Sequence, residues 1–227
     1  MAPSDVRIDF NALPPPQLEI SSDQVVIINT SASDLSLDLG TRKLANSVKW
    51  NAVVENCEFR LHDPKLAIFY KAVAKSCRFI AKRIQIELHW RNVRLIDCSF
   101  RGKYRFCQFG FQYPEFLDFP GEVRGCDFSE ARLDYCIFGN TDLLSIIWPQ
   151  EPHVIFFEPS RHKEEIRAIV PEWPLQGRLQ ETAIRDDECS AVAYSVDYLV
   201  KQKKYPEEQL QRFYGRCRVL DFVSINF

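Results

Sequence analysis

A five-residue pattern recurs along the middle of this chain and limits the folds it can adopt. In the clearest stretch, Gly125 to Leu143 (GCDFSEARLDYCIFGNTDL), a small residue, a variable residue and a large apolar residue return every five positions. In extended backbone the small and large residues, two positions apart, point to the same side. Because five is odd, a straight strand would turn the next pair to the opposite side. The pattern therefore predicts a coil that turns once per unit and directs these pairs at a common axis.

Four such units would make a four-sided coil with a period of twenty residues, and apolar residues do recur near that spacing in two columns. We expect both columns to fill the axis of the coil, although the repeat slips near 82 to 88 and 103 to 107. The first column comprises Leu39, Phe59, Phe79, Phe100, Phe119 and Phe138, and its small partners include Cys57, Cys77, Cys98 and Cys136. The second column comprises Phe69, Trp90, Phe109, Phe128 and Trp148.

These units resemble the pentapeptide-repeat family, whose pattern A(D/N)LXX places a small residue two positions before Leu or Phe. The matching units are NCEFR at 56–60, SCRFI at 76–80, DCSFR at 97–101 and the four units from 125 to 144. The resemblance covers about Leu18 to Trp148 and implies a mainly β fold, a right-handed quadrilateral β-helix. Stacking at about 4.8 Å per coil lets backbone groups pair with the coils above and below, and we expect about six to seven coils.

The rest of the chain divides at the ends of this repeat. Residues 1–17, with three consecutive prolines at 14 to 16, predict an extended N-terminal arm before a β-helix at 18–150. Residues 151–227 predict a small helical cap, because apolar residues there recur at spacings of three and four. Three helices are expected: one capped by Ser160 and ending before Pro171, one over about 179–203 with Cys189, Val192, Val196 and Leu199 on one face, and one opened by Pro206.

Composition favours a soluble globular protein. Of the 227 residues, 46% are hydrophobic and 26% charged, no run of eighteen apolar residues occurs, and the start of the chain lacks the pattern of a secretory signal. Six of the eight cysteines precede a phenylalanine by two positions, none forms a CxxC pair, and the four histidines are scattered. We therefore expect packed free thiols, no metal or other cofactor, and a reducing, cytoplasmic location.

Catalytic signals are weak. The chain has none of the motifs GxSxG, GxxxxGK[ST], GxGxxG or HExxH. Cys189 is a conceivable nucleophile, but its spacing favours a core position, and His62 occupies an inward slot of the coil. The acidic run at 186 to 188 fits a helix start without a metal. We expect no enzymatic activity.

Charge is distributed unevenly along the coil. Residues 42–105 hold 15 Lys or Arg against 5 acids, whereas residues 106–150 hold 7 acids against 2 Arg. The excess is either a solvated surface or a binding face for an anionic partner. The candidate basic face comprises Lys71, Lys75, Arg78, Lys82, Arg83, Arg91, Arg94, Arg101, Lys103 and Arg105.

Aromatic residues crowd the stretch from 101 to 115 beyond what the two columns need. They form either an exposed interface or a cluster packed under a loop, and the sequence leaves both open. The candidate aromatic interface comprises Tyr104, Phe111, Tyr113 and Phe116.

These features favour a non-catalytic scaffold, a rigid rod that binds a protein partner through its faces and its helical tail, with homodimerisation through the C-terminal helices as a possibility. The family resemblance implies one alternative, since some pentapeptide-repeat proteins mimic duplex DNA and bind bacterial type II topoisomerases in quinolone resistance. That role calls for an acidic rod with regular coils, and this chain has a basic middle and frame slips. Binding of nucleic acid or an anionic surface through residues 42–105 is the other alternative.

Overall fold

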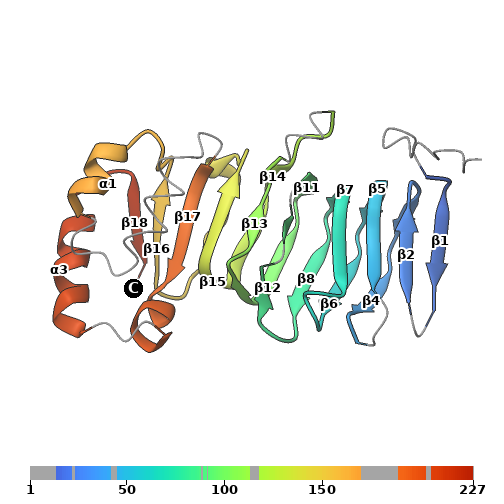
Figure 1. Cartoon of the computed structure of the whole chain (residues 1–227), viewed down its shortest axis with the longest axis horizontal. Helices are drawn as coiled ribbons and strands as arrows, with labels where there is room; N and C mark the ends of the chain where they lie inside the picture. Colours follow the sequence, from blue (N-terminus) through green and yellow to red (C-terminus); the bar gives the residue numbers. More distant parts are fainter. Residues whose placement is uncertain are drawn as a thin grey trace, which may run out of the picture.

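The computed structural model describes residues 14–21, 24–41, 45–87, 89–90, 92–112, 118–169, 189–202 and 206–226. It confirms a mainly β fold: a β-solenoid runs from the N-terminal end of the chain to a small cap at the C-terminal end (Figure 1). Among the described residues, no helix combines the length and the apolar character that crossing a membrane requires.

Each turn of the solenoid has four sides, and equivalent sides of successive turns pair in parallel. Side 1 contains β2 (Val25–Ile28), the first parts of β5 (Asn46–Glu55) and β7 (Ala67–Lys75), β10 (His89–Trp90) and β13 (Gln108–Phe109). Side 2 contains β3 (Ser31–Ser33), the later parts of β5 and β7, β11 (Val93–Ile96) and β14 (Glu122–Arg124). Side 3 contains β4 (Ser36–Leu39), β6 (Glu58–Leu61), β8 (Arg78–Ala81) and the first parts of β12 (Ser99–Arg105) and β15 (Asp127–Gly139). Side 4 contains β9 (Gln85–Ile86), the end of β12 and the middle of β15.

The corners between sides are made by residues with positive φ, as a turn every five residues requires. Fourteen non-glycine residues of the described chain have positive φ, and half of them are Asn or Asp, which tolerate this region best. At the corner between sides 3 and 4, Gly102 has φ +95°, and a Cβ there would lie 2.6 Å from the Ala81 carbonyl oxygen. Glycine at this position lets successive coils approach each other closely.

Two stacks of aromatic rings fill the axis. Phe100 stacks on Phe79 at 5.1 Å and on Phe128 at 4.5 Å between ring centroids, and its edge meets Trp90 of the other stack. The first stack is Phe59, Phe79, Phe100 and Phe128, and the second is Phe69, Trp90, Phe109 and Phe138. This interior is apolar and continuous, as the sequence predicts.

The predicted columns need correction at their ends. Phe128 and Phe138 exchange stacks, and Leu37 rather than Leu39 lies opposite Phe59. Phe119 is half-buried outside the axis, beneath the guanidinium of Arg94. Trp148 meets the edge of Phe138 and is only partly buried, so it closes the second stack at its end.

An insertion causes the exchange of Phe128 and Phe138. The chain leaves the coil at Gly110 and returns at Gly121, where a Cβ would lie 2.5 Å from the Gly110 carbonyl oxygen. The period across this turn therefore lengthens from about twenty residues to the 28 that separate Phe100 from Phe128. The solenoid has about 4 turns rather than six to seven. The insertion accounts for less than half a coil of this difference, and β1, which was counted in the repeat, pairs antiparallel outside the coils.

All eight cysteines are free and buried. Cys57, Cys77, Cys98 and Cys126 occupy equivalent positions before β6, β8, β12 and β15, whereas Cys136 lies above Cys107 near the start of side 1. Their thiols donate to carbonyl oxygens of neighbouring rungs, for example from Cys98 to Ala74 at 3.3 Å. They act as small apolar residues that fit the narrow interior, as expected.

The N-terminal end of the stack carries a hairpin. β1 (Gln17–Ile20) pairs antiparallel with β2, so it does not belong to a coil, and all four of its residues are exposed. Asn29 anchors the preceding segment by donating to the Pro14 carbonyl oxygen at 3.0 Å. Residues 1–13, most of the predicted arm, lie outside the described residues.

The cap is a mixed α/β unit rather than a purely helical one. β17 (Cys189–Ser195) pairs antiparallel with the end of β15 and with β16 (His153–Phe157), and β18 (Val223–Asn226) extends this sheet. The helices are α1 (Lys163–Ile169), α3 (Glu207–Cys217), the 3-10 turn η2 (Leu143–Ser145), which precedes the cap, and the short π-helical turn η4 (Tyr198–Gln202).

The first and third predicted helices correspond to α1 and α3, but the prediction of a helix over 179–203 is wrong at 189–195. These residues form β17, which is almost entirely buried because the last coil and the cap enclose it. Residues 179–188 of that prediction, including the acidic run at 186 to 188, lie outside the described residues.

Candidate binding surface

Side 4 is where cationic and aliphatic side chains meet on the outside of the solenoid. Gln85, Tyr104 and Leu133 point inward from its three rungs, so their neighbours along each strand point outward. Ile84 and Ile86 are 37% and 42% exposed, which is unusual for isoleucine on both sides of a buried glutamine. Lys82, Arg83 and Lys103 are exposed next to them in sequence or on the next rung. We call these residues the side 4 patch: Lys82, Arg83, Ile84, Ile86 and Lys103.

The cations of the side 4 patch carry uncompensated charge. Within the described part of the chain, Lys82, Arg83 and Lys103 have no ion-pair partner and no side-chain hydrogen bond. Glu87 is the acid next to Ile86, and it is exposed as well. The patch therefore presents net positive charge around two aliphatic side chains.

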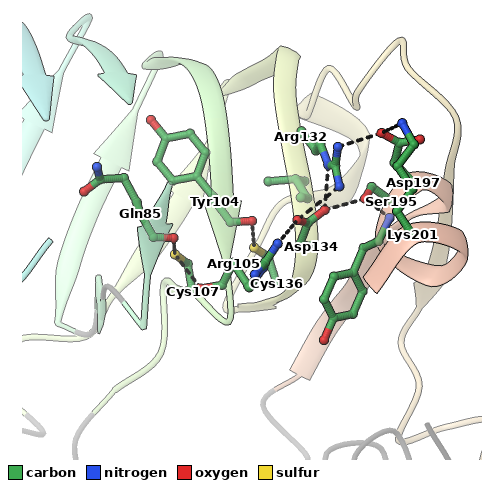
Figure 2. Close-up of polar contacts among 12 residues, drawn as sticks. Gln85, Tyr104, Arg105, Cys107, Arg132, Asp134, Cys136, Ser195, Asp197 and Lys201 are labelled. Atoms are coloured by element: carbon green, nitrogen blue, oxygen red, sulfur yellow. Dashed lines mark hydrogen bonds and ion pairs between the residues drawn. The ribbon is translucent and has the colours of Figure 1, made fainter. Parts of the chain in front are cut away.

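A buried ion-pair network closes side 4 toward the cap (Figure 2). Asp134, which is fully buried, lies 3.2 Å from Nη2 of Arg105 and 2.9 Å from Nε of Arg132. The Ser195 hydroxyl also donates to Asp134, and it accepts from the Tyr198 backbone N–H at 3.0 Å. A carboxylate this deep needs such partners, since an unpaired buried charge is costly.

The same network joins the solenoid to the cap. Arg132 donates to Asp197 at 2.8 Å, Lys201 reaches Asp197 at 3.0 Å, and the guanidinium of Arg105 lies over the ring of Tyr198 at 5.4 Å. We call Arg105, Arg132, Asp134, Ser195 and Asp197 the cap junction. The cap junction fixes the orientation of η4 on side 4, and the charges of both arginines are balanced by Asp134 and Asp197.

His153 lies under the junction as a neutral ring. Its Nε2 accepts from the Leu133 backbone N–H at 3.0 Å, and its Nδ1 donates to the Glu151 carbonyl oxygen at 2.8 Å. Burial lowers the pKa of His153, which keeps the accepting nitrogen unprotonated. Both ring nitrogens are thus occupied by backbone groups, so the histidine serves packing rather than catalysis.

The structure separates most of the predicted basic face. Arg78 and Arg101 lie on side 3 in ion pairs with Glu58 and Glu130, and Lys75 is exposed on side 2. Lys71 is buried and pairs with Asp118, Arg94 covers Phe119, and Arg105 belongs to the cap junction. Arg91 lies outside the described residues. Of the nine predicted cations that the structure describes, only Lys82, Arg83 and Lys103 gather on one surface with free charge.

The predicted aromatic interface is wrong where the structure describes it. Tyr104 is fully buried and donates its hydroxyl to the Phe79 carbonyl oxygen at 3.0 Å, and burial raises its pKa. Phe111 is buried in the apolar cluster between the last coil and the cap. Packing, the second of the two possibilities, explains both residues. Tyr113 and Phe116 lie outside the described residues.

The candidate catalytic residues also have structural roles. Cys189 is buried in β17, and its thiol donates to the Ala191 carbonyl oxygen at 3.5 Å. His62 is 31% exposed, contrary to its predicted inward slot, because its ring turns out to Asp38 at 2.8 Å. Among the described residues, no group of three or more His, Cys, Asp or Glu side chains could hold a metal ion.

A hollow of about 280 Å³ on side 3 is lined by Ser99, Arg101, Asp127, Ser129 and Glu130 among others. Arg101 and Glu130 pair with each other, and Asp127 accepts from the Ser129 backbone N–H at 2.8 Å. These groups already pair with one another, so the hollow has fewer unpaired charged groups that could bind a ligand than the side 4 patch.

Comparisons with family models, with curated proteins and with solved structures each find no match to this chain. The candidate surface therefore depends on the chemistry of its own residues. Sequence reasoning missed Ile84 and Ile86, which fall in a frame slip. The sequence feature that could have identified them is an alternation opposite to the usual one, because the polar Gln85 points inward and both isoleucines point outward.

Proposed function

We propose that this protein is a non-catalytic interaction scaffold that binds a protein partner through the side 4 patch. The observation that carries the proposal is the pair of exposed isoleucines surrounded by three cations without counter-ions. An apolar centre with a charged rim is the usual anatomy of a protein-binding surface. The backbone that presents it is rigid, because β9 and β12 pair within the solenoid and Gln85 donates to the Leu61 and Arg83 carbonyl oxygens at 3.1 Å.

The same chemistry favours protein over nucleic acid. Binding of a phosphate backbone is favoured by a row of cations. The phosphate backbone offers no apolar surface that could pack against the exposed isoleucines, so these side chains would not contribute to the binding of nucleic acid. The basic region 42–105 does not form such a track, because its arginines at 60, 78 and 101 are paired with acids on side 3. Nucleic acid or anionic-surface binding remains the less favoured proposal.

DNA mimicry is also less favoured. A mimic needs rows of unpaired acids along the rod, whereas acids of the last coils pair with cations: Glu130 with Arg101, and Glu122 with Arg124 at 3.0 Å. Asp134 is buried. Because cations pair with Glu122 and Glu130 and Asp134 is buried, these acids of the last coils do not form the unpaired rows of a polyanion.

We further propose that the chain is a divergent pentapeptide-repeat protein that acts in the cytoplasm. The alternation of small and aromatic residues along the axis supports the family proposal, and the free buried thiols support a reducing location. A homodimer through the cap has less support, because the exposed face of α3 carries polar residues such as Glu208, Gln211 and Arg212. Light scattering at high protein concentration tests the monomer that we expect.

Affinity capture from the native host tests the binding proposal. The wild-type protein is compared with Ile84→Ser/Ile86→Ser and with Lys75→Glu, a matched control that changes an exposed cation on side 2 which has no ion-pair partner among the described residues. We expect the double variant to lose partners that the wild type and the control retain, while all three melt at similar temperatures. Equal capture by all three proteins would contradict a role for the side 4 patch.

A further inference from the structure

We infer that the occupant of the side 4 patch is a short acidic segment that carries aliphatic side chains, such as an exposed tail or loop of the partner. This inference rests on the proposed function and narrows it to one kind of partner. The size of the patch, its boundaries and its charge lead to this conclusion.

The patch is too small for a folded domain. Lys82 to Ile86 and Lys103 occupy two neighbouring rungs, so the patch measures on the order of 10 Å by 16 Å at about 4.8 Å per rung and about 3.3 Å per residue. A stable interface between two folded proteins buries about 800 Å² on each partner. A single extended segment or the face of one short helix fits a surface of this size.

The boundaries of the patch keep its charge local. Toward the cap, Arg105 and Arg132 are only 18% and 12% exposed and bond to Asp134. Toward the N-terminal end, the chain passes through the turn after β6, where Asp63 accepts from the Lys65 backbone N–H at 2.9 Å. Lys82, Arg83 and Lys103 therefore lie together, whereas other exposed cations without ion pairs among the described residues, such as Lys65 and Lys75, lie in the turn after β6 and on side 2.

The cations select carboxylates, and the isoleucines select aliphatic groups. Lys82 and Lys103 act as compact point charges, and Arg83 can bind a carboxylate with two parallel hydrogen bonds. Ile84 and Ile86 are two positions apart and flank the inward Gln85, so an extended segment with alternating acidic and aliphatic residues can place its apolar side chains on both. The cations alone would accept any anion and the isoleucines alone any apolar group, so it is their combination that favours a segment with both acidic and aliphatic side chains.

Fluorescence anisotropy with defined probes tests the inference. The probes are a labelled peptide in which Glu alternates with Leu, the same peptide with Ser in place of Leu, and an oligothymidylate of equal length. We expect the Glu-Leu peptide to bind the wild-type protein about tenfold more tightly than the Glu-Ser peptide and the oligonucleotide. Its affinity should also fall as salt is raised, since exposed charges contribute.

Variants separate the two contributions. Lys82→Glu/Lys103→Glu should weaken binding of the Glu-Leu peptide by about tenfold or more, and Ile84→Ser/Ile86→Ser should remove its advantage over the Glu-Ser peptide. Lys75→Glu should leave both affinities unchanged. Thermal melting of each variant checks that the solenoid remains folded, since all these side chains are exposed.

Each outcome decides the inference. If the Glu-Leu peptide does not bind, or if the oligonucleotide binds more tightly, the acidic-segment inference is wrong. The proposed function survives that result if host capture still depends on Ile84 and Ile86, because the partner then has another chemistry. If host capture does not depend on them, the proposed function fails whatever the peptide does.

Discussion

The solenoid and the cap junction hold the chain together with opposite chemistry. In the solenoid, equivalent apolar rings stack on one another along the axis, and each rung repeats the contacts of the last. At the cap junction, five polar residues, from β12, β15, β17 and the position just before η4, form one network with a single geometry. Stacked apolar contacts tolerate exchange between apolar residues of similar size, whereas a buried charge network requires every member. The two regions should therefore respond differently to substitution, pH and salt.

Removal of one ring from the middle of the aromatic stacks should have the largest effect. Phe100→Ala removes stacking on Phe79 and Phe128 and edge contacts with Trp90 and Tyr104, and leaves a cavity in a fully packed axis. We expect a loss of about 3–5 kcal/mol in the free energy of unfolding. Urea denaturation followed by circular dichroism measures it, and a loss below about 1 kcal/mol would show that the axis is loosely packed.

Removal of the carboxylate of the cap junction should come next. Asp134→Ala leaves the guanidinium groups of Arg105 and Arg132 close together with their main counter-ion gone. Breaking a buried ion pair from one side costs about 3–5 kcal/mol, and since both arginines retain some exposure we expect about 3 kcal/mol. Hydrogen exchange of the variant, compared with that of the wild type, should be accelerated more in β16, β17 and β18 than in β6 and β8.

A matched acidic substitution tests whether burial causes this effect. Glu130→Ala removes the partner of Arg101 on side 3, where both side chains are about two-thirds exposed. We expect a change of less than about 1 kcal/mol. If Glu130→Ala and Asp134→Ala cost the same, the contrast between the junction and the exposed surface is wrong.

The same contrast explains what the sequence could predict. The solenoid follows from a local rule, since a small and a large residue two positions apart recur after a turn every five residues. The insertion between Gly110 and Gly121 was missed because Phe119 obeys the same spacing, and only the contact between the two glycines shows where the coil is interrupted. Beyond Gly121, the sides to which the sequence assigns the residues are therefore shifted by about half a coil, as the exchange of Phe128 and Phe138 between the stacks shows.

The cap and the candidate surface depended on contacts that are distant in sequence. β17 was predicted as a helix because a strand buried on both sides loses its alternation, so its apolar spacing also fits a helix. The partners of the predicted cations could not be foreseen, since Arg132 pairs with Asp197, 65 residues away, and Lys71 with Asp118, 47 residues away. Lys82, Arg83 and Lys103, three members of the predicted basic face, are exposed.

The pH dependence of stability should also distinguish the junction from the stacks, and its effect should be smaller than that of Phe100→Ala or Asp134→Ala. Burial lowers the pKa of His153, whose ring faces Asp134, Glu151 and Arg132. The unfolded chain therefore takes up a proton below about pH 6.5 that the folded protein resists, and stability falls as the pH decreases below that value. The slope for one proton is at most about 1.4 kcal/mol per pH unit.

His153→Gln is the matched variant for this prediction. Glutamine can accept from the Leu133 N–H and donate to the Glu151 carbonyl oxygen, as the histidine does, but it does not titrate. We expect the variant to flatten the decrease in stability between pH 6.5 and 5, measured by denaturation at each pH. An unchanged slope would assign the pH dependence to other groups.

The smallest effect should come from an exposed ion-pair cluster on side 3. Hydrogen bonds from Arg60, together with one from His62, lower the pKa of Asp38 to about 2, so the stability they provide is present above pH 3.8 and is lost as the pH falls through 2. Because the Asp38 side chain is 42% exposed, solvent screens these bonds, and Asp38→Asn should cost less than about 1 kcal/mol at neutral pH. Added salt should reduce this cost further but should leave most of the cost of Asp134→Ala, since buried pairs are screened much less. Denaturation of both variants at low and high salt measures the difference. An equal salt response would mean that water reaches Asp134, and the junction would then be a surface cluster like that of Asp38.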